Sequence, residues 1–98
     1  MFVNIIKSYR DVVAICDKEL IGKKFEEGIL QLDIKENFFK GKECTKEEVS
    51  EIMEDMRLED STFNIVGEKS INLALEVGII RKEGVRKING IPFALVLI

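Results

Sequence analysis

The densest group of chemically capable side chains lies in the stretch VVAICDKELIGKKFEEG, residues 12–28. A thiol, two carboxylates and a lysine, Cys16, Asp17, Glu19 and Lys23, fall within eight positions. A cysteine can act as a nucleophile when a neighbouring lysine or a helix N-terminus lowers the pKa of its thiol. These four residues are therefore the candidate site if the protein is a small enzyme.

Two features weaken that hypothesis. The chain has no histidine, which excludes Cys–His and Ser–His mechanisms within one subunit. Adjacent residues of a strand point to opposite faces, so Cys16 and Asp17 do not face each other unless the strand ends between them. The alternative is that Cys16 is a small buried hydrophobic residue. We favour it, regard an enzyme as the less favoured hypothesis, and assign no catalytic residue.

The residues also offer poor metal ligands. Two cysteines 28 positions apart, without histidine, do not make the usual tetrahedral zinc sets. The acidic pairs Asp17 with Glu19 and Glu26 with Glu27 lack the spacing of a calcium loop. We therefore predict no metal and no cofactor.

Charge is distributed unevenly along the chain. The net charge is −3, which argues against a globally basic nucleic-acid binder. Residues 43–60 hold eight acids against two bases, and residues 79–98 hold four bases against one acid. The candidate contacts to RNA or an acidic partner are Lys23, Lys24, Arg86 and Lys87. In a regular hairpin Arg86 and Lys87 would point to opposite faces, which divides this basic set.

Length and composition indicate one globular domain over residues 1–98. The chain is 46% apolar and 34% charged, close to globular expectation. Two cysteines without a CxxC pair fit a reducing compartment, so we expect a cytoplasmic protein. The longest apolar stretch, residues 91–98, is far shorter than the ~20 residues of a membrane helix. We expect no membrane segment.

Alternation and helical periodicity predict the elements. Strands are expected at residues 2–8, 12–16 and 29–35, the second of them inside the sheet because it is apolar on both faces. Residues 17–27 are expected to be a loop with a helical turn, and residues 37–42 and 60–65 are expected to be connectors. In the strand at 29–35, Leu30, Leu32 and Ile34 should face the core.

Two helices have clear boundaries. Thr45 and Glu48 have the spacing of a capping box, which predicts a helix over residues 46–58. A second helix is expected over residues 68–77, ended by Gly78 in a left-handed C-terminal cap. Gly67 could expose helix N–H groups to an anion, but the acidic residue after it disfavours that ligand.

The chain should end in a hairpin. Residues 85–88 and 91–98 flank Asn89-Gly90, a strong signal for a type I′ turn. The second strand is apolar on both faces, so it must be covered on both, by the helices or by another subunit. A homodimer through this strand is one way to meet that requirement.

Together these elements predict an α+β single domain, with a mixed or antiparallel sheet of about five strands and two helices packed on it. CDxELxGKxFxxG at residues 16–28, VGE at 66–68 and the final hairpin resemble the small archaeal family known as domain of unknown function 424, over nearly the whole chain. The family pattern in the last strand is Gly-x-Pro-His-Ala-Gln, whereas this chain has GIPFAL at residues 90–95. Any chemical role of that histidine is lost here.

The resemblance implies an archaeal cytosolic protein without an assigned activity and with a loose association with translation. The function we favour is a non-catalytic binding module that docks on RNA or a protein of the translation machinery. The alternatives are an enzyme centred on Cys16 and a self-associating structural protein.

Overall fold

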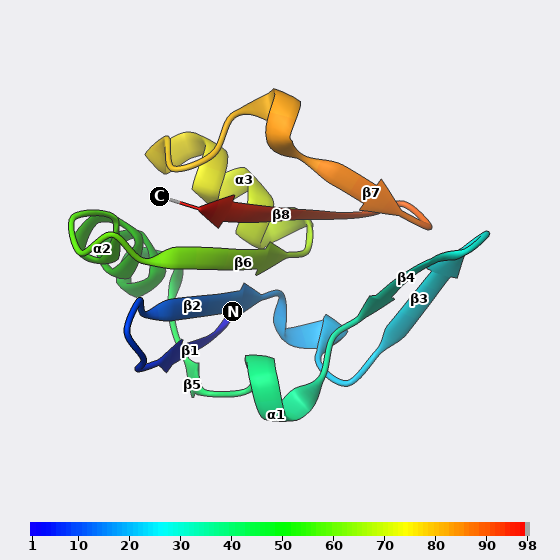
Figure 1. The fold of residues 1–98 in the computed structure, drawn as a ribbon, viewed down its shortest axis with the longest axis horizontal. Helices are drawn as coiled ribbons and strands as arrows, with labels where there is room; N and C mark the ends of the chain where they lie inside the picture. Colours follow the sequence, from blue (N-terminus) through cyan, green and yellow to red (C-terminus); the bar gives the residue numbers. More distant parts are fainter. Residues whose placement is uncertain (98) are drawn as a thin grey trace.

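The structure, a computed structural model, describes residues 1–97 and arranges them around a six-stranded sheet (Figure 1). The strands, in chain order, are β1 (Phe2–Ile6), β2 (Val12–Cys16), β3 (Lys24–Glu27), β4 (Leu30–Asp33), β5 (Lys42–Glu43), β6 (Thr62–Val66), β7 (Arg86–Ile88) and β8 (Ile91–Leu97). The helices are α1 (Glu36–Phe39), α2 (Lys46–Arg57) and α3 (Glu68–Val77), with short 3-10 turns η1 (Lys18–Leu20) and η2 (Lys82–Gly84).

The sheet is mixed. Its strand order is β5-β1-β2-β6-β8-β7, and only the central pair β2 and β6 is parallel. Strands β3 and β4 form a separate antiparallel hairpin. The predicted class, α+β with helices packed on a mixed or antiparallel sheet, is confirmed, and of the two sheet types the structure has the mixed one. The main sheet has one strand more than expected, and β2 lies inside it as predicted.

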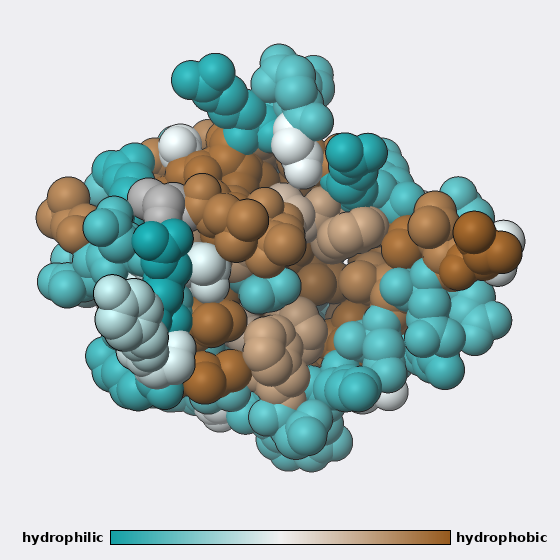
Figure 2. All heavy atoms as spheres, viewed as in Figure 1, coloured by the Kyte–Doolittle hydropathy of each residue, from teal (hydrophilic) through white to brown (hydrophobic). Residues whose placement is uncertain are grey.

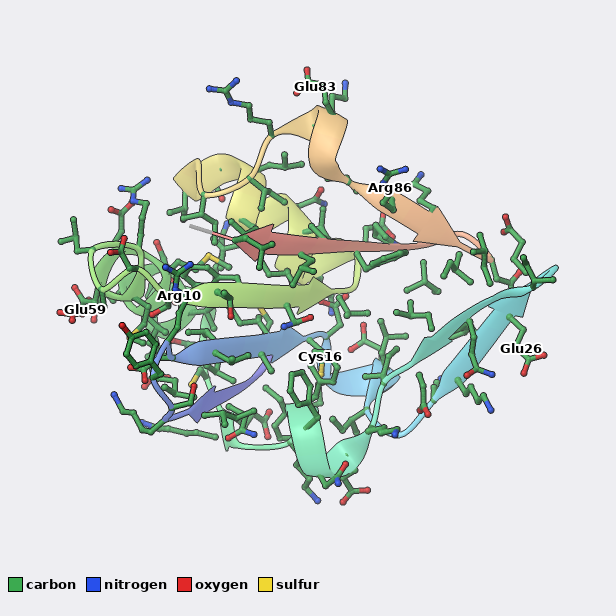
Figure 3. All side chains as sticks on the ribbon, in the orientation of Figure 1. Arg10, Cys16, Glu26, Glu59, Glu83 and Arg86 are labelled. Carbon is green, nitrogen blue, oxygen red and sulfur yellow. The ribbon has the colours of Figure 1, made fainter. Side chains whose placement is uncertain are left out.

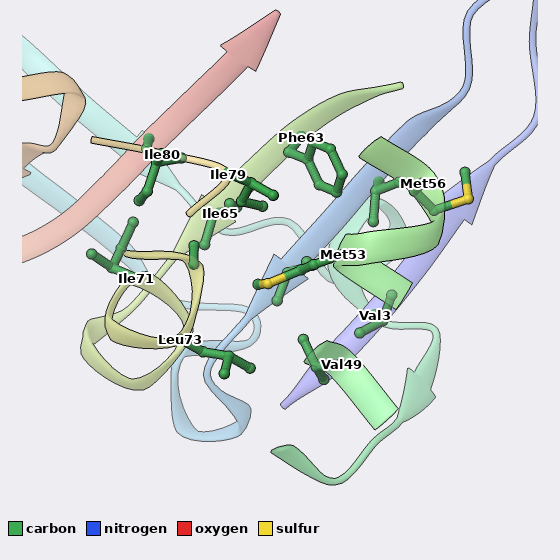
Figure 4. Packing of buried hydrophobic residues seen from close by; sticks show 14 of the residues in the cluster. Val3, Val49, Met53, Met56, Phe63, Ile65, Ile71, Leu73, Ile79 and Ile80 are labelled. Atoms are coloured by element: carbon green, nitrogen blue, oxygen red, sulfur yellow. The ribbon is translucent and has the colours of Figure 1, made fainter. Parts of the chain in front are cut away.

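Helices α2 and α3 cover one face of the sheet (Figure 4). Val13 and Ile15 of β2 and Phe63 and Ile65 of β6 are fully buried there. The apolar stripe of α2 packs on them, with Met53 fully buried. This is the main core, and its aliphatic composition follows from the chain's scarcity of aromatic residues.

The opposite face is covered at one end only. There α1 and the β3–β4 hairpin pack over the ends of β2 and β6, and Cys16, Ile34 and Phe39 are buried between them. Leu95 and Leu97 of β8 lie further along this face and are 60% and 72% exposed. The expectation that β8 is covered on both faces is therefore not met within the chain, since the helices cover one face.

Several local predictions are confirmed. Thr45 and Glu48 form a reciprocal capping box at the start of α2, and the backbone N–H of Thr45 lowers the pKa of Glu48 by hydrogen bonding to its carboxylate. Gly78 ends α3 with a φ of 92°, in the left-handed region. Asn89 and Gly90 both have positive φ, as a type I′ turn requires.

Other predictions are wrong. Residues 60–65, expected to connect two helices, contain most of the central strand β6. Residues 24–27, expected in a loop, form strand β3, which turns back at Gly28 into β4. Leu30 is 54% exposed because it lies next to this turn and not over the core. The connector at 37–42 contains part of α1 and the start of β5, and the predicted strand end at residue 98 lies outside the described residues.

Candidate functional site

Asp17 lies where β2 ends and η1 begins, and its side chain reaches α3. One carboxylate oxygen accepts hydrogen bonds from the backbone N–H and the hydroxyl of Ser70, at 2.8 and 2.7 Å. The other oxygen accepts from the backbone N–H of Lys69 at 3.0 Å. Asp17 is 3% exposed. It therefore caps the N-terminus of a helix that begins 51 residues later in the chain.

The cap is needed because α3 has none of its own. The residue before the helix is Gly67, which has no side chain to accept the first helical N–H groups. Gly67 has a φ of 109°, and a Cβ at this position would clash with the carboxyl carbon of Asp17. The glycine thus allows the carboxylate to approach the helix end. From the sequence we expected the acidic residue after Gly67 to lie where an anion would bind at the start of this helix. In the structure the carboxylate of Asp17 lies there.

Cys16 points the other way. It is fully buried between β2, α1 and the hairpin (Figure 3). Burial raises the pKa of its thiol to about 12, with the nearby Asp17 carboxylate adding to the effect. Such a thiol is protonated and inaccessible at neutral pH, so the geometry favours the interpretation of Cys16 as a buried hydrophobic residue.

Glu19 and Lys23 do not join Cys16 in a site. Glu19 makes an ion pair with Lys69 at 3.8 Å, between two largely exposed side chains. Lys23 is exposed, and its backbone carbonyl accepts a hydrogen bond from the N–H of Ile34. Of the four candidate residues, the structure therefore brings only Asp17 and Glu19 to one groove.

That groove lies between η1, the start of α3 and the β7–β8 turn. It has a volume of about 350 Å³ and is lined by polar side chains that include Glu19, Lys69 and Asn72, with Ile91 and Pro92 on the other side. Sequence reasoning missed Lys69, Ser70 and Asn72. The one available signal was the absence of a capping side chain at Gly67, which implies a cap from elsewhere in the chain.

A second groove of about 340 Å³ continues past the same turn. Its lining includes Lys82 and Lys87 together with Val85 and Leu75. Within residues 1–97, no three His, Cys, Asp or Glu side chains are grouped so that they could hold a metal ion. The described chain also contains no helix of the length and apolarity needed to cross a bilayer.

The four candidate RNA contacts come from two segments that meet. Strand β7 lies against the β3–β4 hairpin, and the carboxylate of Glu27 accepts a hydrogen bond from the N–H of Asn89 at 2.8 Å. Arg86 pairs with Phe93 and Lys87 with Pro92, so the two cations lie on opposite faces of β7, as the hairpin argument predicted.

On the hairpin, Lys24 lies opposite Asp33, on the face away from Phe25 and Leu32. The exposed Lys23 precedes it. The four cations are therefore arranged around the edge of the sheet and do not form one continuous patch.

The basic residues differ in whether they have acidic partners. Seven make ion pairs: Lys7, Lys18, Lys40, Lys42, Lys46, Arg57 and Lys69. Among the described residues, seven others have no ion pair: Lys23, Lys24, Lys35, Arg81, Lys82, Arg86 and Lys87. All seven unpaired cations lie in residues 23–35 and 81–87, which include all four candidate contacts.

Comparison with known proteins finds a family of unknown function and an uncharacterized structural neighbour. A family model described as "Protein of unknown function (DUF424)" matches residues 6–98. The fold is similar to that of a crystal structure of an uncharacterized conserved protein from Methanopyrus kandleri, with a TM-score of 0.83 and 23% sequence identity. The alignment covers 98% of this chain and 90% of that one. The comparison with curated proteins gives no match.

Proposed function

Because this chain belongs to the DUF424 family, whose description assigns no activity, we propose a function from the geometry: a small non-catalytic module that binds RNA. The observation that carries the proposal is the confinement of the seven unpaired cations to residues 23–35, which contain the β3–β4 hairpin, and residues 81–87, which contain η2 and the start of β7. Cations already paired with acids have less to gain from a phosphate, whereas unpaired ones keep their full attraction for it.

Because β7 is an edge strand, its two basic side chains are accessible to an RNA strand. Arg86 and Lys87 project from opposite faces of the last strand of the sheet, and both are exposed. Long basic side chains on the two faces of an edge strand can contact successive phosphates of a strand running past that edge. Arg86 is labelled in Figure 3, on the β7 ribbon.

The state of the candidate catalytic residues supports a binding role. The Asp17 carboxylate is engaged by three hydrogen bonds from α3, and the Cys16 thiol is buried with a raised pKa. Neither is available to a substrate. The observations give no comparable support to an enzyme centred on Cys16.

Binding of a labelled single-stranded RNA, followed by fluorescence anisotropy over a series of salt concentrations, tests the proposal. The double variant Arg86→Gln/Lys87→Gln should bind more weakly at low salt. Its slope of log affinity against log salt should fall by about 1.4, roughly 0.7 for each phosphate that the variant no longer neutralises.

The matched control is Lys42→Gln/Lys46→Gln, which removes the same charge from two ion-paired lysines. It should leave the salt slope unchanged. The proposal fails if the protein binds no RNA at low salt, or if the two double variants lower the slope equally.

A further inference from the structure

Strand β8 has an outer edge that β7 covers only in part. The β7–β8 pairing runs from Ile88↔Ile91 to Arg86↔Phe93 and stops there. Pairing with β6 on the other side continues to Thr62↔Leu97. The last four residues of β8, Ala94–Leu97, therefore have a strand on one side and none on the other.

The direction of the backbone groups along this edge follows from the ladder. The carbonyl of Pro92 accepts a hydrogen bond from the N–H of Gly67, so Pro92 points its backbone toward the β6 side. In an antiparallel ladder successive residues alternate between the two neighbouring strands. Leu95 therefore points its N–H and C=O to the outer side, as does Leu97.

Within residues 1–97 these outward groups have no hydrogen-bond partner in the chain. The side chains of Leu95 and Leu97 are exposed on the face that the helices do not cover. Figure 2 shows apolar side chains gathered over β8 on that face. An unpaired backbone edge beside apolar side chains is a template for an added strand.

The space beside the edge is open, and the one charged residue in its lining, among the described residues, is an arginine. A groove of about 280 Å³ lies between β8 and the segment that leads into η2, lined by Ile79, Ile80, Arg81 and Gly84 together with the edge itself. Arg81 is exposed and has no ion pair among the described residues. Glu83, the middle residue of η2, points away from β8 (Figure 3).

We propose that this edge binds an extended peptide segment of a partner protein, antiparallel to β8, in which apolar and acidic side chains alternate. The apolar side chains would lie beside Leu95 and Leu97 on the open face, and the acidic ones would face the groove that Arg81 lines. Antiparallel is the direction in which β7 already pairs with the same edge.

Charge argues against a second copy as the occupant. Pairing the edges of two copies would bring two Arg81 side chains and two positively charged C-terminal segments together. An acidic peptide has the complementary charge. This site lies beyond the end of β7. It shares Arg81 with the set of unpaired cations but contains none of the four proposed RNA contacts, Lys23, Lys24, Arg86 and Lys87.

The test uses a synthetic peptide of sequence EVEVEVE with blocked ends, and measures binding by fluorescence anisotropy and amide hydrogen exchange. Binding should slow exchange of the Leu95 and Leu97 amides. In antiparallel pairing the valine amides face the edge, so N-methylation of the valines should weaken binding by at least about tenfold. N-methylation of the glutamates should not.

Two charge-reversal variants of the protein serve as the test and its matched control. Arg81→Glu should weaken binding by about fivefold at low salt, whereas Lys46→Glu, the same change at the start of α2, should leave it unaltered. The proposal is overturned if the peptide does not bind, or if both sets of N-methyl groups weaken binding equally.

It is also overturned if the same two amides are protected without peptide in a dimer seen by sedimentation. Protection of these amides by RNA alone would overturn it as well, since it would make the edge part of the RNA surface.

Discussion

The two faces of the central sheet differ in what covers them. On the helix face, side chains such as Phe63 and Ile65 are fully buried under α2 and α3. On the other face, α1 and the hairpin bury Cys16 at one end and leave Leu95 and Leu97 open at the other. The helix face therefore provides most of the buried core, whereas the other face leaves apolar surface exposed that a partner could cover. Four experiments test this difference.

The largest effect is expected on the helix face. Phe63→Ala removes a fully buried ring from the centre of the core, which should lower the free energy of unfolding by about 3–5 kcal/mol. Denaturant unfolding followed by circular dichroism measures it. A loss below about 1 kcal/mol would show that this face is not the principal core.

Asp17→Ala should lower the free energy of unfolding by about 2–4 kcal/mol. The change leaves two backbone N–H groups of α3 and the buried Ser70 hydroxyl without their acceptor. Thermal unfolding gives the measurement. The matched control is Glu19→Ala, which removes a largely exposed carboxylate from the same groove and should cost about 0.5 kcal/mol or less. Equal losses for the two variants would contradict a structural role for Asp17.

Alkaline pH should lower the free energy of unfolding through Cys16, which is buried at the covered end of the second face. The Cys16 thiol has a pKa of about 12 in the folded protein, against an ordinary value of 9.0, so the unfolded chain loses this proton first. Stability from this group is complete below pH 9 and falls between about pH 9 and 12, by up to about 1.4 kcal/mol per pH unit.

Urea unfolding at several pH values measures the alkaline effect, with Cys16→Ala as the reference. The variant should be less stable at pH 7 but show a shallower alkaline decline. Parallel pH curves for the two proteins would show that Cys16 is not held protonated by burial.

The smallest effect is expected at the open end. Leu95→Ser replaces a 60% exposed side chain and should change the free energy of unfolding by no more than about 0.5 kcal/mol. Denaturant unfolding checks this in the isolated protein. A loss comparable to that of Phe63→Ala would mean that this face is covered in solution.

Features set by neighbouring residues could be predicted from the sequence. The capping box at Thr45 and the type I′ turn at Asn89-Gly90 depend on positions within three residues of each other, and both are present. Strand β6 could not be predicted in this way. Its sequence TFNIV alternates, but so short a segment between two helices also fits a connector. Its burial depends on two neighbouring strands that are distant in sequence.

The site was less predictable for the same reason. The residue types drew attention to Asp17 correctly, but its role depends on Ser70, 53 positions away. The division of Arg86 and Lys87 between two faces follows from strand alternation and was predicted. The segregation of paired from unpaired cations was not, since ion pairs such as Lys18–Glu43 join segments that only the fold brings together.

The parallel pairing of β2 with β6 has a kinetic consequence. Val12 lies beside Thr62, so the middle of the sheet closes a loop of about 50 residues, and contacts of such sequence separation slow folding. During synthesis the first 60 residues can form the β1–β2 hairpin but not the central β2–β6 pair. The main apolar surface of the nascent chain therefore stays exposed to other unfolded chains until β6, and then β8, has been synthesised.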